Sequence, residues 1–138
     1  MLPSFASAQS VWKEFELPTG VKFWAIRVIE KAKASELSLR EEIILFIKAE
    51  SQEKDLPENK VVAIANCESR LNPKAYNPDD VDGRPKYGLF QFDKNTYVGK
   101  DIWDWKEQTR QATDWMEKGY WRKWPVCNKT WKKYQVGG

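Results

Sequence analysis

The sequence predicts a mainly α-helical domain with one long loop and at most a short β-hairpin. Apolar residues recur at helical spacing in four stretches, residues 21–34, 38–53, 61–71 and 105–118. The connection over residues 72–86 is aperiodic and holds three prolines, three aspartates and a glycine. A loop of this length inside a domain usually has a function. At 138 residues, the chain is long enough for one domain with a buried core.

Residues 1–20 are expected to be a flexible N-terminal segment, and the domain is expected to occupy residues 21–138. Ala6-Ser7-Ala8 fits the small-x-small pattern of a signal-peptidase site, but no charged region followed by an apolar one precedes it. The segment is therefore either the remnant of a leader or a plain flexible end. No stretch is long and apolar enough to span a membrane, so we expect no transmembrane segment.

The second predicted helix has a clear start. Ser38-Leu-Arg-Glu41 has the pattern of a capping box, which predicts a helix from Ser38 to about Glu53. This helix is heavily apolar and is expected to pack across the helix that follows it. Pro57 suits the first position of that next helix, where a missing backbone N–H costs nothing.

The third predicted helix carries an acidic residue on its apolar face. Val61, Ile64 and Ala65 lie at i, i+3 and i+4, and the next position on the same face is Glu68. Pro73 is expected to end the helix a few residues later. A carboxyl group that faces inward loses solvation, which raises its pKa and suits it to general acid catalysis near neutral pH. Periodicity alone leaves open the alternatives of a solvated Glu or a structural ion pair.

The C-terminal part contains a fourth predicted helix and a basic tail. Asp104 is expected to cap a helix over residues 105–118, and Gly119 is expected to end it. Its inward residues are predicted to be Gln108, Ala112, Trp115 and Met116. Residues 120–138 are basic and aromatic. We predict that part of this segment packs into the fold and that part forms a surface patch that binds an anionic polymer.

Composition excludes several classes of site. Eight Trp, six Phe and five Tyr are a high aromatic content that suits stacking on sugar rings. The net charge of +3 is too small to indicate nucleic-acid binding. There is no His, which excludes His-dependent triads and His-ligated metals, and two Cys cannot build a Cys-rich zinc site. We expect no metal, no cofactor and a monomer.

An ordered set of motifs follows the third helix. It consists of Glu68-Ser69, Asn72-Pro73-Lys74-Ala75, Asn77 and Tyr87-Gly88-Leu89-Phe90-Gln91. This set resembles the signature of the soluble lytic murein transglycosylases, over residues 68–91 and more loosely as far as Cys127. The resemblance implies a lysozyme-like helical fold with a long cleft loop, and peptidoglycan glycan strands as the substrate.

The resemblance also implies a role for the two cysteines. Small secreted members of the family often carry one Cys before the catalytic Glu and another near the end, which here are Cys67 and Cys127. A disulfide between them would imply an oxidising, extracytoplasmic location, either periplasmic or secreted.

Carried over residue by residue, the family chemistry assigns catalysis to Glu68 alone. It would protonate the bond between N-acetylmuramic acid and N-acetylglucosamine and then deprotonate the C6 hydroxyl, leaving a 1,6-anhydro product. Ser69 would orient Glu68 or the acetamido group, and Asn77 would bind the sugar. The residues expected to line the cleft are Tyr87, Gly88, Leu89, Phe90, Gln91 and, less closely matched, Tyr97.

Three alternatives remain open. If Asp79, Asp80 or Asp82 faces Glu68 across a suitable gap, the enzyme would hydrolyse its substrate as a lysozyme does. A degenerate domain that binds glycan without cleaving it is disfavoured by the intact Glu68, Ser69 and Gln91. A cell-wall resuscitation factor would use the same chemistry on a related fold, but its Trp-rich approach to the Glu is absent.

Overall fold

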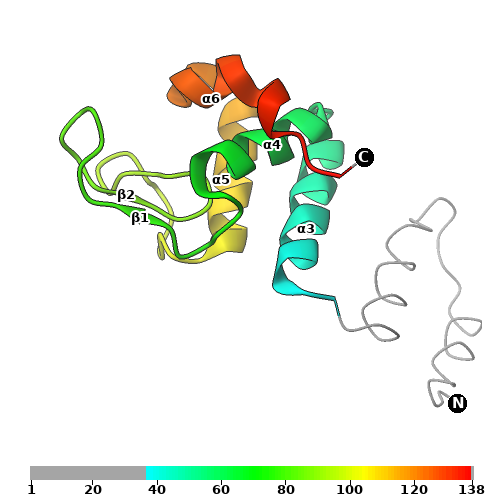
Figure 1. The fold of residues 1–138 in the computed structure, drawn as a ribbon, viewed down its shortest axis with the longest axis horizontal. Coiled ribbons are helices and arrows are strands. Elements are labelled where there is room, and N and C mark those ends of the chain that lie inside the picture. Colours follow the sequence, from blue (N-terminus) through cyan, green and yellow to red (C-terminus); the bar gives the residue numbers. More distant parts are fainter. Residues whose placement is uncertain (1–36, 138) are drawn as a thin grey trace, which may run out of the picture. The chain divides into compact units, whose positions relative to one another are not determined.

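The computed structural model describes residues 37–137 (Figure 1). The predicted helix at residues 21–34 and the domain boundary predicted after residue 20 lie outside the described residues. From Leu39 onward the chain forms one unit that is mainly α-helical, as predicted. Its elements are α3 (Leu39–Glu53), α4 (Glu58–Ser69), β1 (Tyr76–Asn77), β2 (Lys86–Tyr87), α5 (Trp105–Glu117), the 3-10 helix η1 (Trp121–Lys123), α6 (Pro125–Thr130) and the 3-10 helix η2 (Trp131–Tyr134).

Helices α3 and α4 pack against each other as predicted (Figure 1). Helix α3 begins one residue after the predicted start and ends at the predicted Glu53, and it buries Ile43 and Ile47 completely. The prediction for Pro57 is wrong by one position, because Pro57 is the N-cap of α4 and Glu58 is the first helical residue. The Pro57 carbonyl accepts the first backbone hydrogen bonds of the helix, from Lys60 and Val61.

Helix α4 ends earlier than the sequence predicts. Its last residue is Ser69, and both Arg70 and Leu71 adopt left-handed backbone conformations, with φ of 58° and 60°. The helix is therefore ended by a local turn rather than by Pro73. That turn places Leu71 in the core, where its side chain is 4% exposed.

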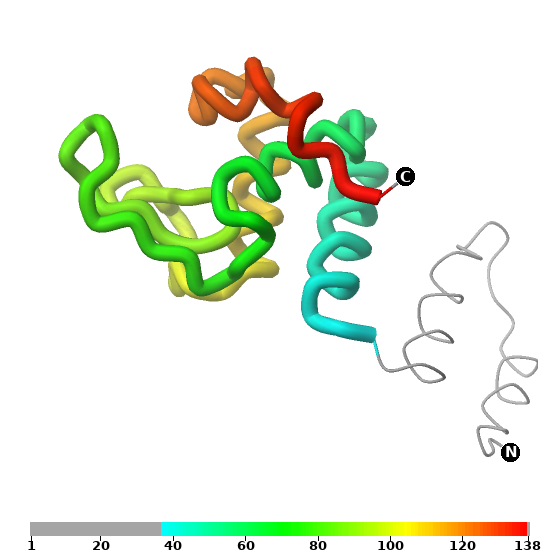
Figure 2. The backbone as a smooth tube through the Cα atoms, in the orientation of Figure 1, coloured from blue at the N-terminus to red at the C-terminus, as the bar shows by residue number. Residues whose placement is uncertain are grey.

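The long loop is bounded by a short antiparallel hairpin. Strands β1 and β2 pair with Tyr76 opposite Tyr87 and Asn77 opposite Lys86. Tyr87 then exchanges two backbone hydrogen bonds with Phe92, which closes a tight turn over residues 88–91. Figure 2 shows the hairpin and its loop at the side of the unit away from α3. The sequence predicted at most a short β-hairpin, and the structure contains one.

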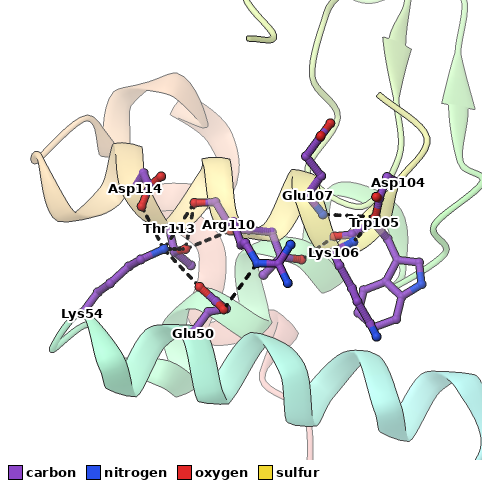
Figure 3. A network of polar contacts seen from close by, with 10 residues as sticks. Glu50, Lys54, Asp104, Trp105, Lys106, Glu107, Arg110, Thr113 and Asp114 are labelled. Atoms are coloured by element: carbon purple, nitrogen blue, oxygen red, sulfur yellow. Dashed lines mark hydrogen bonds and ion pairs between the residues drawn. The ribbon is translucent and has the colours of Figure 1, made fainter. Parts of the chain in front are cut away.

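Helix α5 begins at the predicted Trp105 and ends one residue before the predicted Lys118. The Asp104 carboxylate accepts hydrogen bonds from the backbone N–H groups of Lys106 and Glu107, and Gly119 follows the helix with φ of +88°. Helix α5 is joined to α3 by a polar network around Lys54 (Figure 3). The Lys54 Nζ atom lies 3.2 Å from Glu50 and 2.9 Å from Asp114. This network links α5 to the C-terminal end of α3 through Lys54 and Glu50, whose side chains are only 14% and 16% exposed.

The C-terminal segment folds back over α4. Its short helices η1, α6 and η2 have no periodic pattern in the sequence and were not predicted. Trp124 buries its ring in the core, and Asn66 on α4 donates a hydrogen bond to the Tyr134 carbonyl. Within residues 37–137, none of the helices has the length and apolar character needed to cross a membrane.

Candidate active site

A cavity of about 530 Å³ opens where the end of α4, the hairpin loop, the turn after β2 and the start of α6 meet. This volume is within the range of sites that bind small molecules or sugar units. The charged residues of its wall are Glu68, Asp80, Asp82, Arg84, Lys86, Asp93 and Lys123. Its aromatic residues are Phe90, Phe92, Trp115 and Trp124.

Glu68 lies in this wall at the last turn of α4, on the face predicted from the periodicity. Val61, Ile64 and Ala65 on the same face are completely buried. The pKa of Glu68 is raised from its ordinary 4.5 to about 7, first by burial and second by the negative charge of Asp80, while the positive charge of Lys86 partly offsets the rise. A carboxyl group with this pKa is partly protonated at neutral pH and can both donate and accept a proton.

An acidic pair and a lysine from the hairpin loop share the cavity with Glu68. The Lys86 Nζ atom lies 2.9 Å from Asp80 and 2.8 Å from Asp82, and its side chain is only 12% exposed. Asp80 therefore faces Glu68 as part of an ion pair rather than as a free carboxylate. Asp79 does not line the cavity, and its backbone N–H donates to the Asn77 side chain.

The cysteine pair adjoins Glu68, because Cys67 is the residue that precedes it in the sequence. Cys67 and Cys127 form a disulfide, with a Cα–Cα distance of 5.8 Å, which confirms the pairing expected from the resemblance. Cys127 also contributes to the cavity wall. The bridge thus ties the last turn of α4, next to Glu68, to α6 on another side of the cavity.

The turn over residues 88–91 is held by a single buried side chain of α5. Gln108 is completely buried, and its Oε1 accepts a hydrogen bond from the Phe90 N–H at 2.6 Å. Its Nε2 donates to the carbonyls of Tyr87 at 3.1 Å and Ile102 at 2.8 Å. Gly88 has φ of +81°, and a Cβ there would lie 2.5 Å from Gln108 Nε2. The glycine is therefore required both by the backbone conformation and by the contact.

Two of the predicted cleft residues, Phe90 and Gln91, line the cavity together with Glu68. Gln91 donates through Nε2 to the Gly88 carbonyl at 2.9 Å, which keeps its amide at the turn. Phe90 is 0% exposed and packs on Trp124, whose indole N–H donates to the Phe90 carbonyl. Phe90 therefore packs in the core and also lines the cavity, and its contact with the sugar stays a prediction.

Four other predicted residues lie near the cavity but outside its lining. Ser69 is buried and donates to the Ala65 carbonyl of its own helix at 3.0 Å. Gly88 and Leu89 are buried in the turn. Asn77 pairs with Lys86 across the hairpin and accepts a hydrogen bond from the Asp79 N–H.

The two tyrosines are not brought into the cavity. The Tyr97 hydroxyl donates to Glu107 at 2.6 Å and its ring packs on Phe92. Burial and the hydrogen bond to Glu107 raise the pKa of Tyr97 above its usual range. Tyr87 follows Lys86 on β2 and does not line the cavity either. The predicted contact of the two tyrosines with the sugar strand stays a prediction.

Sequence reasoning missed Lys86 and Trp124 in the cavity wall and the holding role of Gln108. Lys86 carried a usable signal, because it follows Asp82 at a distance of four residues in a loop that holds three aspartates. Gln108 was expected to point inward but not to bind the turn, and nothing local in the sequence specifies that contact. Among residues 37–137, no group of three acidic or cysteine side chains is arranged to hold a metal ion.

One comparison with known proteins gives a match. Residues 45–114 match the family model of the transglycosylase SLT domain, which is just over half of the chain. The matched range contains Glu68, the hairpin, the turn and Gln108. No curated protein and no solved structure matches the chain.

Proposed function

Because the chain belongs to the transglycosylase SLT family, we propose that it is a lytic transglycosylase that cleaves the β-1,4 bond between N-acetylmuramic acid and N-acetylglucosamine in peptidoglycan. The observation that carries this proposal is Glu68, a carboxyl group with a pKa of about 7 in the wall of a cavity. The family acts on peptidoglycan; the bond, the single catalytic residue and the product are the parts we propose.

In the first step the Glu68 carboxylic acid donates its proton to the glycosidic oxygen. The bond between C1 of the muramic acid unit and that oxygen breaks, and the N-acetylglucosamine unit leaves with a free hydroxyl. The substrate's own N-acetyl group stabilises the positive charge that develops at C1. A pKa near neutrality is what allows Glu68 to hold this proton at the pH of the reaction.

In the second step the Glu68 carboxylate accepts the proton of the C6 hydroxyl of the same muramic acid unit. The C6 oxygen bonds to C1 and closes the 1,6-anhydro ring, so no water is consumed. Glu68 ends protonated, as it began. The cycle therefore requires one carboxyl group that exchanges a proton twice, in agreement with one raised pKa at the site.

A lysozyme-type hydrolase is the second candidate, and a specific observation favours it. Asp80 and Asp82 line the same cavity as Glu68, and a second carboxylate on the far side of the scissile bond is what hydrolysis requires. Against this, Lys86 binds both aspartates at 2.9 and 2.8 Å, which leaves them less able to activate a water. The ion pair makes the transglycosylase our first choice.

The proposed substrate sets the location. Peptidoglycan lies outside the cytoplasmic membrane, so we infer that the protein acts there, in the periplasm or after secretion. The Cys67–Cys127 disulfide is compatible with such an oxidising compartment. We propose that the protein acts as a monomer.

The test combines product analysis with substitution of Glu68. Products from purified peptidoglycan are separated and weighed, because an anhydro end is lighter than a hydrolysed one by one water. Glu68→Gln keeps the size of the side chain but cannot transfer a proton, so the cleavage rate should fall at least about a hundredfold while the fold remains. Cleavage by Glu68→Gln at near the wild-type rate would show that the assignment is wrong.

The loop aspartates provide matched controls. Asp80→Asn and Asp82→Asn change cavity residues, whereas Asp79→Asn changes a neighbour outside the lining. All three variants should retain much of the wild-type cleavage. Loss of activity in Asp80→Asn or Asp82→Asn alone, together with hydrolysed product ends, would instead identify a lysozyme-type hydrolase.

A further inference from the structure

A cluster of three aromatic rings lies on the hairpin and the loop before α5, outside the cavity. The Tyr87 ring contacts Tyr76 at a centroid distance of 5.2 Å and Trp103 at 5.4 Å. Lys94 places its ammonium group 5.0 Å from the centroid of the Tyr87 ring. We refer to Tyr76, Tyr87 and Trp103 as the outer platform.

The register of the hairpin pairs two rings of the outer platform. Lys86 lines the cavity, whereas its neighbour Tyr87 on the same strand does not. Tyr76 pairs directly with Tyr87, so these two rings share a face. None of the three platform residues lines the cavity.

The exposure of the platform is unusual for this domain. Tyr76 is 54% exposed and Trp103 is 44% exposed, whereas Phe90, Phe92 and Trp124 are at most 4% exposed. Within residues 37–137, the only other aromatic side chain with comparable exposure is Tyr120, at 51%. Ring contacts that merely held the hairpin in place would not require the two outer rings to face solvent.

The chemistry of the outer platform matches a polysaccharide. Sugar rings present apolar C–H faces that stack on aromatic rings, and their hydroxyl rims hydrogen-bond to groups such as the Tyr hydroxyl and the Trp indole N–H. Lys94 adds a positive charge beside these rings, which complements the carboxylates that peptidoglycan carries on its lactyl groups and peptides. An uncharged apolar partner would gain nothing from Lys94.

We propose that the outer platform is a second, non-catalytic binding site for a glycan strand of peptidoglycan. The ligand class rests on the proposed function, whereas the existence of the site rests on the exposed rings and their place outside the cavity lining. Because none of the platform residues lines the cavity, the platform holds a segment of glycan other than the one presented to Glu68. The site would hold the protein on the insoluble wall while Glu68 acts on a neighbouring segment.

The test measures binding and cleavage separately. Full-length protein is sedimented with purified insoluble sacculi at low temperature, and cleavage is measured on short soluble peptidoglycan fragments. Tyr76→Ala and Trp103→Ala should each weaken sacculus binding roughly five- to thirtyfold, as expected for truncation of an aromatic anchor. Both variants should cleave the soluble fragments within about twofold of the wild-type rate.

Two further variants guard against loss of folding and non-specific effects. Tyr120→Ala removes a ring of similar exposure outside the platform and should bind sacculi like the wild type. Lys94→Ala removes an exposed side chain with little risk to the fold and should weaken binding about two- to fivefold. Thermal unfolding of each variant identifies any that are destabilised.

Wild-type sacculus binding by Tyr76→Ala, Trp103→Ala and Lys94→Ala would overturn the proposal. An equal loss of sacculus binding in Tyr120→Ala would also overturn it. A parallel loss of soluble-fragment cleavage in the platform variants would place the rings in the catalytic cleft and would overturn it as well. The proposed function is judged separately, by the mass of the wild-type products. If the proposed function fails, the sedimentation result can still be interpreted. If the platform proposal fails, the product masses can still be interpreted.

Discussion

At the scale of single residues, the environment of Glu68 determines its chemistry. A glutamate one turn earlier on the same face would be completely buried, and one in the loop beyond would be solvated. At the end of α4 it is desolvated by the core but opens to the cavity, and it faces Asp80 and Lys86. This position raises its pKa without removing its access to substrate.

The raised pKa of Glu68 should be measurable as a pH-dependent loss of stability. Ionisation of Glu68 is harder in the folded than in the unfolded protein, so its contribution is fully present below pH 4.5 and is lost as the pH rises through about 7. A rise in pKa from 4.5 to about 7 corresponds to about 3 kcal/mol. Denaturant unfolding of the wild type and of Glu68→Gln should therefore diverge between pH 4 and pH 8, with the Gln variant more stable at pH 8.

The comparison with Gln isolates this one group, because all other titrating residues are common to both proteins. Parallel stability curves across this range would mean that Glu68 has an ordinary pKa. Wild-type kcat/KM should fall as the pH rises above about 7, since the free enzyme then loses the acid.

At the scale of elements, helix α5 positions the turn after β2. Gln108 satisfies one N–H and two carbonyl groups around this turn from a completely buried position. Trp124 satisfies the Phe90 carbonyl from the C-terminal segment. The turn that contributes Phe90 and Gln91 to the cavity wall is thus held from two sides by residues distant in sequence.

Replacement of Gln108 should damage both stability and activity. Gln108→Leu removes the side-chain partner of the buried Phe90 N–H and of the Ile102 carbonyl, and one of the two partners of the Tyr87 carbonyl, so the free energy of unfolding should fall by about 2–5 kcal/mol. The turn should also shift, which lowers kcat more than it raises KM if the turn positions the sugar against Glu68. Denaturant unfolding and steady-state kinetics at a temperature well below the unfolding midpoint separate the two effects.

Gln111 on the same helix provides the control. Its side chain accepts one hydrogen bond, from the exposed Val98 N–H at 2.9 Å, and does not touch the turn. Gln111→Leu should cost less than about 1 kcal/mol and leave kcat unchanged. Equal effects of the two substitutions would contradict a specific role for Gln108.

At the scale of the whole molecule, the disulfide joins two segments that enclose the cavity. It links residues 60 positions apart, from the end of α4 to α6. Closing a loop of this length lowers the entropy of the unfolded chain, and on that model the bridge contributes about 4 kcal/mol. The C-terminal short helices have little periodicity of their own and depend on this bridge and on Trp124 for their position.

The double variant Cys67→Ala/Cys127→Ala should therefore unfold at a clearly lower denaturant concentration than the wild type. Reductant should shift the wild type by a similar amount and leave the double variant unaffected. Identical unfolding midpoints for the oxidised wild type and the double variant would show that the bridge contributes nothing to stability.

Local patterns in the sequence were sufficient to predict helices α3, α4 and α5 and the position of Glu68. The spacing of Val61, Ile64 and Ala65 identified the inward face of α4, and Asp104 identified the start of α5. These features depend on side chains within one or two helical turns of each other, so a local pattern records them. The disulfide was predicted from the family resemblance, and the mainly α-helical fold was predicted from the same periodicity. The structure confirms both predictions.

Only the tertiary structure decided which residues surround Glu68. Lys86, Trp124 and Cys127 reach the cavity from different segments of the chain. Gln108 binds the N–H of Phe90, which lies 18 residues earlier in the sequence. Strands β1 and β2 have two residues each, which is too short for alternation to be recognised, so the sequence could not show that Tyr87 lies outside the cavity lining. Contacts between distant segments depend on how helices pack and where a hairpin lies, and no periodicity within one segment encodes them.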